Sequence, residues 1–197
     1  MGDVDGDGIT DLAVGGPDSD LTFSSGGSVT LLSGATGSVI WARGGFAAGD
    51  SFGFAVAGLG GDVNGDGVND LVTGARFSDI AGPNFGAALL LSGVDGSVIR
   101  QHLGSDSNSR FGETLGPAGD VNNDGIPDAI IGARLDESGG SNTGSARVFS
   151  GADGSLLHEL FGDSPSDNFG LTVGTACLLY TSPSPRDQRG SRMPSSA

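Results

Sequence analysis

One pattern occurs three times in the chain: GDVDGDGITDL at residues 2–12, GDVNGDGVNDL at 61–71 and GDVNNDGIPDA at 119–129. The first aspartates of the copies are Asp3, Asp62 and Asp120, so the interval between successive copies is almost constant. A repeat at a fixed period of this size is typical of solenoids and propellers, in which each unit packs against its neighbours. The sequence therefore predicts one supersecondary unit used several times.

Two other markers repeat in phase with the aspartate pattern. Phe-Gly pairs stand at 52–53, 111–112 and 169–170, and an SGxxGS stretch begins at Ser33, Ser92 and Ser150. Both markers recur at the same two intervals as the aspartates. The repeat is therefore strict along the whole unit, which argues against a sandwich, whose strands differ from one another.

The middle unit contains four short strand patterns. We predict strands at 52–57, 68–73, 87–91 and 97–100, separated by turns rich in Asp and Gly. No segment shows an apolar stripe at helical spacing. Four short strands in each unit are typical of a propeller blade. We therefore predict an all-β fold, a β-propeller fragment of about three four-stranded blades.

The spacing of the markers divides the chain. We predict a partial blade at 1–51 whose first strand is missing, complete blades at 52–110 and 111–168, and the start of another at 169–176. The final segment, 177–197, differs abruptly in composition and holds three of the nine arginines and the single cysteine, Cys177. Its codons resemble a sequencing-library adapter, so we expect this segment to be translated adapter; the alternative is a Ser/Pro-rich linker.

The charge excludes two classes of partner. The chain carries 24 acidic and nine basic residues, all nine of them arginine, for a formal net charge of −15. Without 177–197, which contain three arginines and one aspartate, the charge is −17. Nucleic-acid backbones and anionic membrane surfaces select basic proteins, so we predict no nucleic-acid partner and no polybasic membrane anchor. No apolar run approaches the length of about 18 residues that a membrane helix needs, so we also predict no direct membrane insertion.

The aspartate pattern has the composition of a site for a hard cation. Positions 1, 3 and 5 supply carboxylate or amide oxygens, position 7 a backbone carbonyl and position 9 a carboxylate, the all-oxygen set that Ca²⁺ prefers. We predict up to three Ca²⁺ sites, with these ligands: Asp3, Asp5, Asp7, the Ile9 carbonyl and Asp11; Asp62, Asn64, Asp66, the Val68 carbonyl and Asp70; Asp120, Asn122, Asp124, the Ile126 carbonyl and Asp128. Asn at position 3 removes one charge, so the first loop should bind most tightly once its missing strand is restored.

The loops allow two other interpretations. An EF-hand needs a bidentate Glu at position 12, where this chain has Val14, Thr73 and Ile131. The loops could also be Asp-Gly turns that bind no metal. Three in-phase copies favour the metal, and the absence of clustered Cys or His disfavours Zn²⁺.

The repeat resembles the FG-GAP repeat of integrin α-subunit β-propellers and their bacterial relatives. The Phe-Gly pairs, the aspartate loops and the Gly-Ala steps at 74–75 and 132–133 carry this resemblance. Arg76 and Arg134 stand where the motif has Pro, which only Pro17 retains. The resemblance implies a propeller of seven blades, and a protein or glycan ligand bound on the face opposite the calcium loops.

These observations predict a calcium-binding module of a secreted or cell-surface protein, acting in adhesion or ligand recognition, with a signal peptide encoded upstream. We see no catalytic constellation and predict no enzyme activity within residues 1–176. The alternatives are an accessory domain of a larger extracellular hydrolase and a structural spacer. His102 and His158 are expected at the surface. Trp41, Arg100 and His158 share one repeat position, which we expect at an exposed edge; the alternative is that these residues contact a ligand.

Overall fold

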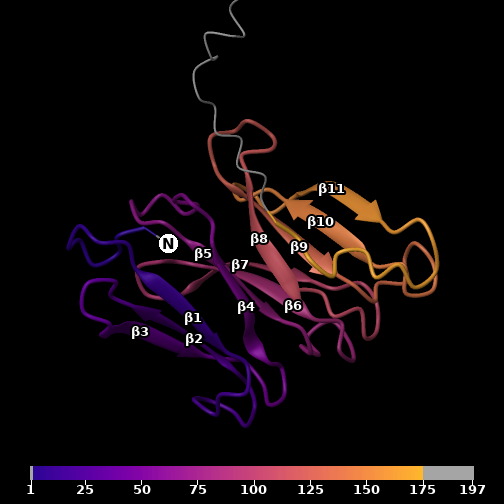
Figure 1. The fold of residues 1–197 in the computed structure, drawn as a ribbon, viewed down its shortest axis with the longest axis horizontal. Coiled ribbons are helices and arrows are strands. Elements are labelled where there is room, and N and C mark those ends of the chain that lie inside the picture. Colours follow the sequence, from indigo (N-terminus) through magenta and orange to yellow (C-terminus); the bar gives the residue numbers. More distant parts are fainter. Residues whose placement is uncertain (1, 175–197) are drawn as a thin grey trace, which may run out of the picture.

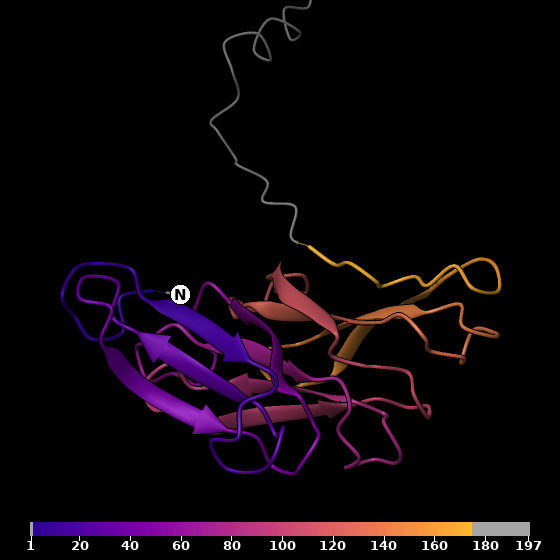
Figure 2. The same cartoon turned by 60° about the horizontal axis from the view of Figure 1, so that its bottom comes forward.

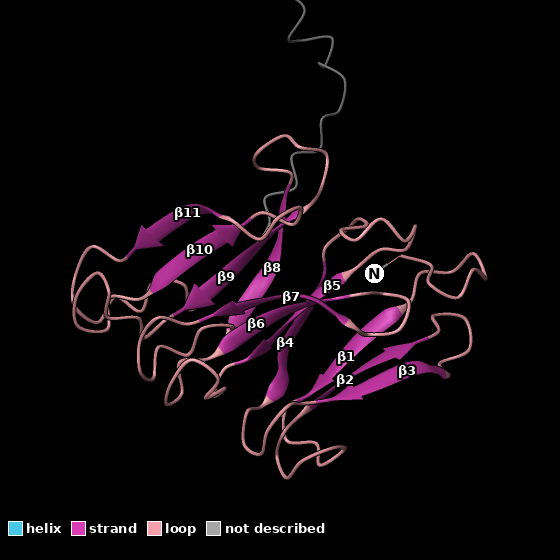
Figure 3. Ribbon diagram, turned by 180° about the vertical axis from the view of Figure 1, so that it is seen from behind, coloured by secondary structure: helices cyan, strands magenta, loops and turns pink. Residues whose placement is uncertain are grey.

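The computed structural model describes residues 2–174, and all regular structure in this range is β-strand (Figure 1, Figure 3). The predicted adapter segment 177–197 lies outside the described residues. Within them, eleven strands form three antiparallel sheets. The strands are β1 (Leu12–Gly16), β2 (Ser28–Leu32), β3 (Val39–Gly44), β4 (Phe52–Gly58), β5 (Leu71–Ala75), β6 (Ala87–Leu91), β7 (Val98–Leu103), β8 (Thr114–Gly119), β9 (Asp128–Ala133), β10 (Ser145–Phe149) and β11 (Leu156–Phe161).

Each sheet is a simple meander in which every strand pairs with the next along the chain. We call the sheet β1–β3 the first blade, β4–β7 the middle blade and β8–β11 the last blade. The strand β4 packs against β1 on one side and β8 on the other, so the blades stand side by side in chain order (Figure 1, Figure 2). The predicted all-β propeller fragment is confirmed; its total of seven blades stays a prediction.

The prediction placed the start of the second strand of the middle blade too early. We expected it at 68–73, whereas β5 begins at Leu71. The N–H of Val68 donates to Asp66 Oδ1 at 2.9 Å, and the N–H of Asp70 donates to the Gly61 carbonyl at 3.0 Å. The backbone at these residues therefore closes the aspartate loop and is not free to pair as a strand. The fourth strand was also predicted too short, since β7 continues to Leu103.

The Phe-Gly and Gly-Ala markers are where neighbouring blades approach backbone to backbone. A Cβ on Gly74 of the middle blade would lie 1.8 Å from the carbonyl oxygen of Gly112, which follows Phe111 in the last blade. Gly112 itself has φ of +84°, a conformation that only glycine adopts without cost. Phe111 also forms a parallel bridge with Gly86. The repeat thus uses glycine to bring successive blades into contact.

The apolar core lies on both faces of the middle blade. One cluster joins Val29 of the first blade to Phe52, Leu71 and Leu89, and a second joins Val72 and Leu90 to the last blade. Every residue of β5 and β6 is buried, whereas β1 and β11 are half-exposed. The middle blade is therefore the best-packed part of the described chain.

The position predicted as an exposed edge instead joins the blades. Trp41 Nε1 donates to the Gly93 carbonyl at 2.7 Å, and Arg100 Nε donates to the Gly151 carbonyl at 2.9 Å. In each case the outer strand of one blade binds the SGxxGS hairpin of the next. For these two residues the prediction was wrong, because edge exposure was judged from one blade without its neighbour. His158, at the same repeat position, is exposed.

His102 is also buried rather than at the surface. Its ring stacks on Phe149 of the last blade, with ring centroids 4.1 Å apart. The residue is 7% exposed, and burial lowers the pKa of its imidazole to about 4. The second histidine, His158, lies at the surface as predicted.

Candidate metal centres

The carboxylate at position 1 organises each aspartate loop. In the middle blade, Asp62 accepts hydrogen bonds from the N–H groups of Gly65 at 2.6 Å and Gly67 at 2.7 Å. Asp3 accepts the equivalent bonds in the first blade, from Gly6 and Gly8, each at 2.8 Å. Glycines with positive φ in this turn let the backbone curl around the carboxylate. The loop is therefore preformed by its own backbone.

The carboxylate at position 9 fastens the loop to the rest of the blade. Asp70 is fully buried; its Oδ2 accepts from Val63 N–H at 2.7 Å and its Oδ1 from Gly93 N–H at 3.0 Å. Asp11 and Asp128 make the same pair of bonds. Burial raises the pKa of Asp70. A residue predicted only as a metal ligand thus also joins the loop to the SGxxGS hairpin.

The three loops differ at position 3. In the first loop, oxygen atoms of Asp3, Asp5 and Asp11 all lie within 4.8 Å of one another. In the middle loop, Asn64 Nδ2 donates to Asp66 Oδ2 at 2.8 Å, and this bond is the main cause of the lowered pKa of Asp66. The last loop repeats the bond between Asn122 and Asp124 at 2.7 Å. The asparagines therefore supply an internal donor that the first loop lacks.

The carboxylate at position 5 faces the hairpin. Ser92 Oγ donates to Asp66 Oδ2 at 3.0 Å, and Ser33 Oγ donates to Asp7 Oδ2 at 3.4 Å. The position-5 carboxylate also accepts the N–H of the position-7 residue, at 2.8 Å for Ile9. These serines were used only as a repeat marker in the sequence, and their contact with the aspartate was not predicted. The constant number of residues between the serine and the aspartate in each repeat could have indicated this contact.

Comparison with known proteins identifies the repeat. The chain matches the FG-GAP repeat family at residues 1–32 and 54–91. This chain is an FG-GAP repeat protein. It is 36% identical over 147 residues to human integrin alpha-X, covering 67% of this chain and 12% of that protein. It is 36% identical over 146 residues to mouse integrin alpha-2, covering 66% and 12%.

The FG-GAP chain therefore spans about an eighth of the length of these curated relatives, since 12% of each is covered. Among solved structures it is similar to rhamnogalacturonan lyase YesW, with a TM-score of 0.49 and 18% identity, covering 85% of this chain and 34% of that one. Across the described residues, no helix has the length and apolar character needed to span a membrane.

The FG-GAP loops have the donor set of a divalent cation site. Three carboxylates of the first loop come together with no arginine paired to them, since each ion pair of the described residues involves Glu113 or Arg147. Like charges this close raise each other's cost of ionisation unless a cation neutralises them. Each of these three side chains offers a carboxylate oxygen as its ligand atom, which favours a hard cation over Zn²⁺. The residues of the first loop therefore fit a hard divalent cation such as Ca²⁺.

Proposed function

We propose that this FG-GAP chain is a Ca²⁺-stabilised propeller module that serves adhesion or ligand recognition in a secreted or cell-surface protein. The observation that carries the proposal is the group formed by Asp3, Asp5 and Asp11, whose oxygens lie within 4.8 Å of one another. The sequence pattern of this loop recurs in the middle and last blades, with Asn at position 3. The kinship with integrin α subunits supports a binding role.

The proposed sites are the fifteen predicted ligands, five in each loop. A bound Ca²⁺ would supply positive charge to carboxylates that otherwise repel one another. The protein's own residues do the positioning. Asp62 shapes the turn, and Asp70 joins it to the SGxxGS hairpin. Occupancy of the loop would therefore hold all four strands of a blade together at that end.

The calcium affinity expected of such loops supports a location outside the cell or at its surface. Calcium sites of extracellular modules bind in the range of about 10⁻⁴–10⁻³ M, which suffices where calcium is millimolar. An extracellular or cell-surface location would meet this condition. We propose a protein or glycan ligand on the face opposite the loops, and a role in binding rather than in catalysis.

Thermal unfolding with and without calcium tests the proposal. Because Ca²⁺ binds the folded chain, we expect calcium to raise the melting temperature by about 5 °C over chelator. Asp66→Ala should lower this calcium-induced shift, because it removes one ligand. The matched control is Asp79→Ala, which removes a carboxylate from the loop after β5, at the opposite end of the same blade, and should leave the shift unchanged. Equal melting of the wild type in calcium and in chelator would refute the proposal.

A further inference from the structure

Three arginines converge on one glutamate at the seam between the middle and last blades. Arg76 Nη1 lies 2.9 Å and Arg110 Nη1 lies 3.5 Å from Glu113 Oε1, while Arg134 Nε donates to Oε2 at 2.7 Å. The three arginine side chains are 22–28% exposed, and that of Glu113 is 11% exposed. The glutamate is thus more buried than the guanidinium groups, which remain partly exposed to solvent.

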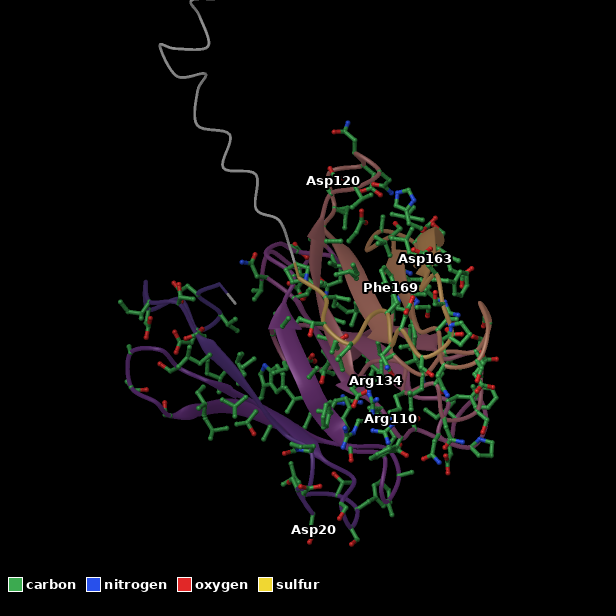
Figure 4. The ribbon with its side chains drawn as sticks, turned by 45° about the vertical axis from the view of Figure 1, so that its right-hand side comes forward. Asp20, Arg110, Asp120, Arg134, Asp163 and Phe169 are labelled. Carbon is green, nitrogen blue, oxygen red and sulfur yellow. The ribbon has the colours of Figure 1, made fainter. Side chains whose placement is uncertain are left out.

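The cluster lies at the end of the blades opposite the aspartate loops. Arg76 follows β5, Arg134 follows β9, and Glu113 precedes β8, all at the ends of these strands away from the aspartate loops. In Figure 4, Arg110 and Arg134 lie beside each other, Asp120 of the last aspartate loop lies at one end of the molecule, and Asp20 lies at the other. This is the face on which we propose ligand binding.

The cluster arises from departures from the repeat. Arg76 and Arg134 occupy the position of Pro17, and Glu113 occupies the position of Phe54. Phe54 instead packs against Arg76, whose guanidinium carbon lies 3.6 Å from its ring centroid. The repeat alone does not require these charges, because the seam between the first and middle blades has Pro17, Ser51 and Phe54 at the positions of Arg76, Arg110 and Glu113.

Arg110 occupies a backbone position that does not favour arginine. Its φ is +59°, in the left-handed region that residues other than Gly, Asn and Asp adopt at a cost. The equivalent residues Ser51 and Asn168 have φ of +55° and +54°, so the fold imposes the conformation. Asn would suit this position better, and the arginine brings a third positive charge to the cluster.

The charges of the cluster do not balance. Three guanidinium groups face one carboxylate, which leaves a local net charge of +2 in a chain whose total is −15. Both oxygens of Glu113 are already occupied, and among the described residues no other carboxylate forms an ion pair with these three arginines. Each guanidinium carries five N–H donors in a planar fork suited to carboxylates. Donors therefore remain for a second anion.

We propose that Arg76, Arg110 and Arg134 form a binding site for a carboxylate side chain of a protein ligand. This inference rests on the proposed role in ligand recognition and names the chemistry of the ligand. Glu113 holds the three guanidinium groups close together, and such a cluster can bind a second carboxylate through bidentate, charge-assisted hydrogen bonds.

The surrounding charges favour a protein over an acidic polysaccharide. The loops that carry the arginines also carry Asp79, Asp106 and Glu137. A polyuronate, with a charge on every sugar, would bring further carboxylates against these side chains. An isolated Asp or Glu flanked by neutral or basic residues avoids that repulsion, as occurs on a protein surface.

The test is a titration of the full chain, in calcium and low salt, with a blocked pentapeptide that has one glutamate among glycines and glutamines. Its control is the same peptide with glutamine in place of glutamate. We expect the glutamate peptide to shift the NMR signals of the Arg76, Arg110 and Arg134 Nε–H groups. Those of Arg43 and Arg100, which bind carbonyls at the seams, should stay in place.

The matched variant is Arg110→Asn, which installs the residue found at the equivalent position 168. It should weaken peptide binding about tenfold through loss of a charge-assisted bond, with no fall in melting temperature. Binding that is unchanged in this variant would overturn the proposal, as would a wild type whose arginine signals do not move. Tighter binding of oligogalacturonate at the same signals would overturn the choice of a protein ligand. The calcium-induced melting shift is measured separately, so failure here is distinguishable from failure of the proposed function.

Discussion

The middle and last blades share a backbone but fill it differently. Four equivalent positions form one patch in each: Ser78, Ala87, Leu89 and Gln101 in the middle blade are Asp136, Ser145, Arg147 and Glu159 in the last. In the middle blade Leu89 is 2% exposed, in an apolar cluster with residues of the first blade. The last blade has an ion-pair network there instead.

The network of the last blade is closed by several bonds. Arg147 Nη2 donates to Asp136 Oδ2 at 2.7 Å and its Nε donates to Glu159 Oε1 at 2.7 Å. Burial acts to raise the pKa of Asp136, but hydrogen bonds from Ser145 and Ser138 outweigh it and the pKa is lowered. One blade backbone thus accepts either an apolar or an ionic interior, provided that every buried charge has a partner.

The largest effect is expected from breaking this network on one side. Asp136→Ala leaves the Arg147 guanidinium, whose side chain is 7% exposed, without its buried partner. Removing one member of a buried pair costs about 3–5 kcal/mol, because the other charge stays desolvated. Denaturant unfolding measures this loss. A cost below about 1 kcal/mol would show that Arg147 finds another partner or water.

The control replaces the whole patch with that of the middle blade. Asp136→Ser, Ser145→Ala, Arg147→Leu and Glu159→Gln together leave no unpaired charge. Exchanging a buried ion pair for apolar residues is often neutral or stabilising by about 1–4 kcal/mol. The quadruple variant should therefore be at least as stable as the wild type, and a large loss would mean that the two interiors are not interchangeable.

The comparison also shows what sequence could predict. The period of the repeat predicted the positions of the blades and the aspartate loops, because equivalent residues of successive repeats adopt the same local structure. It could not reveal that Arg147 pairs with Asp136, since that depends on how neighbouring strands pack. The convergence of Arg76 and Arg134 on Glu113 was missed for the same reason: it crosses a seam between blades. The exposure of Trp41 was misjudged because a single unit does not show its neighbour.

The second prediction concerns His102, whose equivalent in the last blade is Leu160. The folded chain lowers the pKa of His102 from 6.5 to about 4, mainly through burial and secondarily through the charge of Arg100. Between these values the histidine is protonated in the unfolded chain but neutral in the folded chain. The contribution of neutral His102 to the free energy of unfolding is therefore complete above pH 6.5 and decreases as the pH falls towards 4. The loss attributable to His102 should be roughly 3 kcal/mol.

The matched variant for this prediction is His102→Leu, which installs the residue of the last blade. Denaturant unfolding between pH 7 and pH 4 should show a shallower loss of stability in the variant than in the wild type. The carboxylates titrate in both proteins, so the difference between the two curves isolates the histidine. Parallel curves would mean that the imidazole is protonated in the folded chain.

The smallest expected effect is a gain in calcium affinity at the aspartate loops. It should be equal in the middle and last blades, which differ in their interiors but share the same loop. Both aspartate loops have Asn at position 3, with the same bond to the position-5 carboxylate at 2.8 Å for Asn64 and 2.7 Å for Asn122. Asn64→Asp or Asn122→Asp recreates the charge pattern of the first loop and should raise calcium affinity by up to about tenfold, since affinity follows the number of charged ligands. Without calcium each variant should be slightly less stable, because the aspartate repels its neighbour instead of donating to it. Calorimetric titration of both variants measures the change. No hydrogen bond of the described residues joins either loop to the ion-pair network of Asp136, Arg147 and Glu159, so equal gains are expected. Unequal gains would show that this network affects the proposed metal site of the last blade.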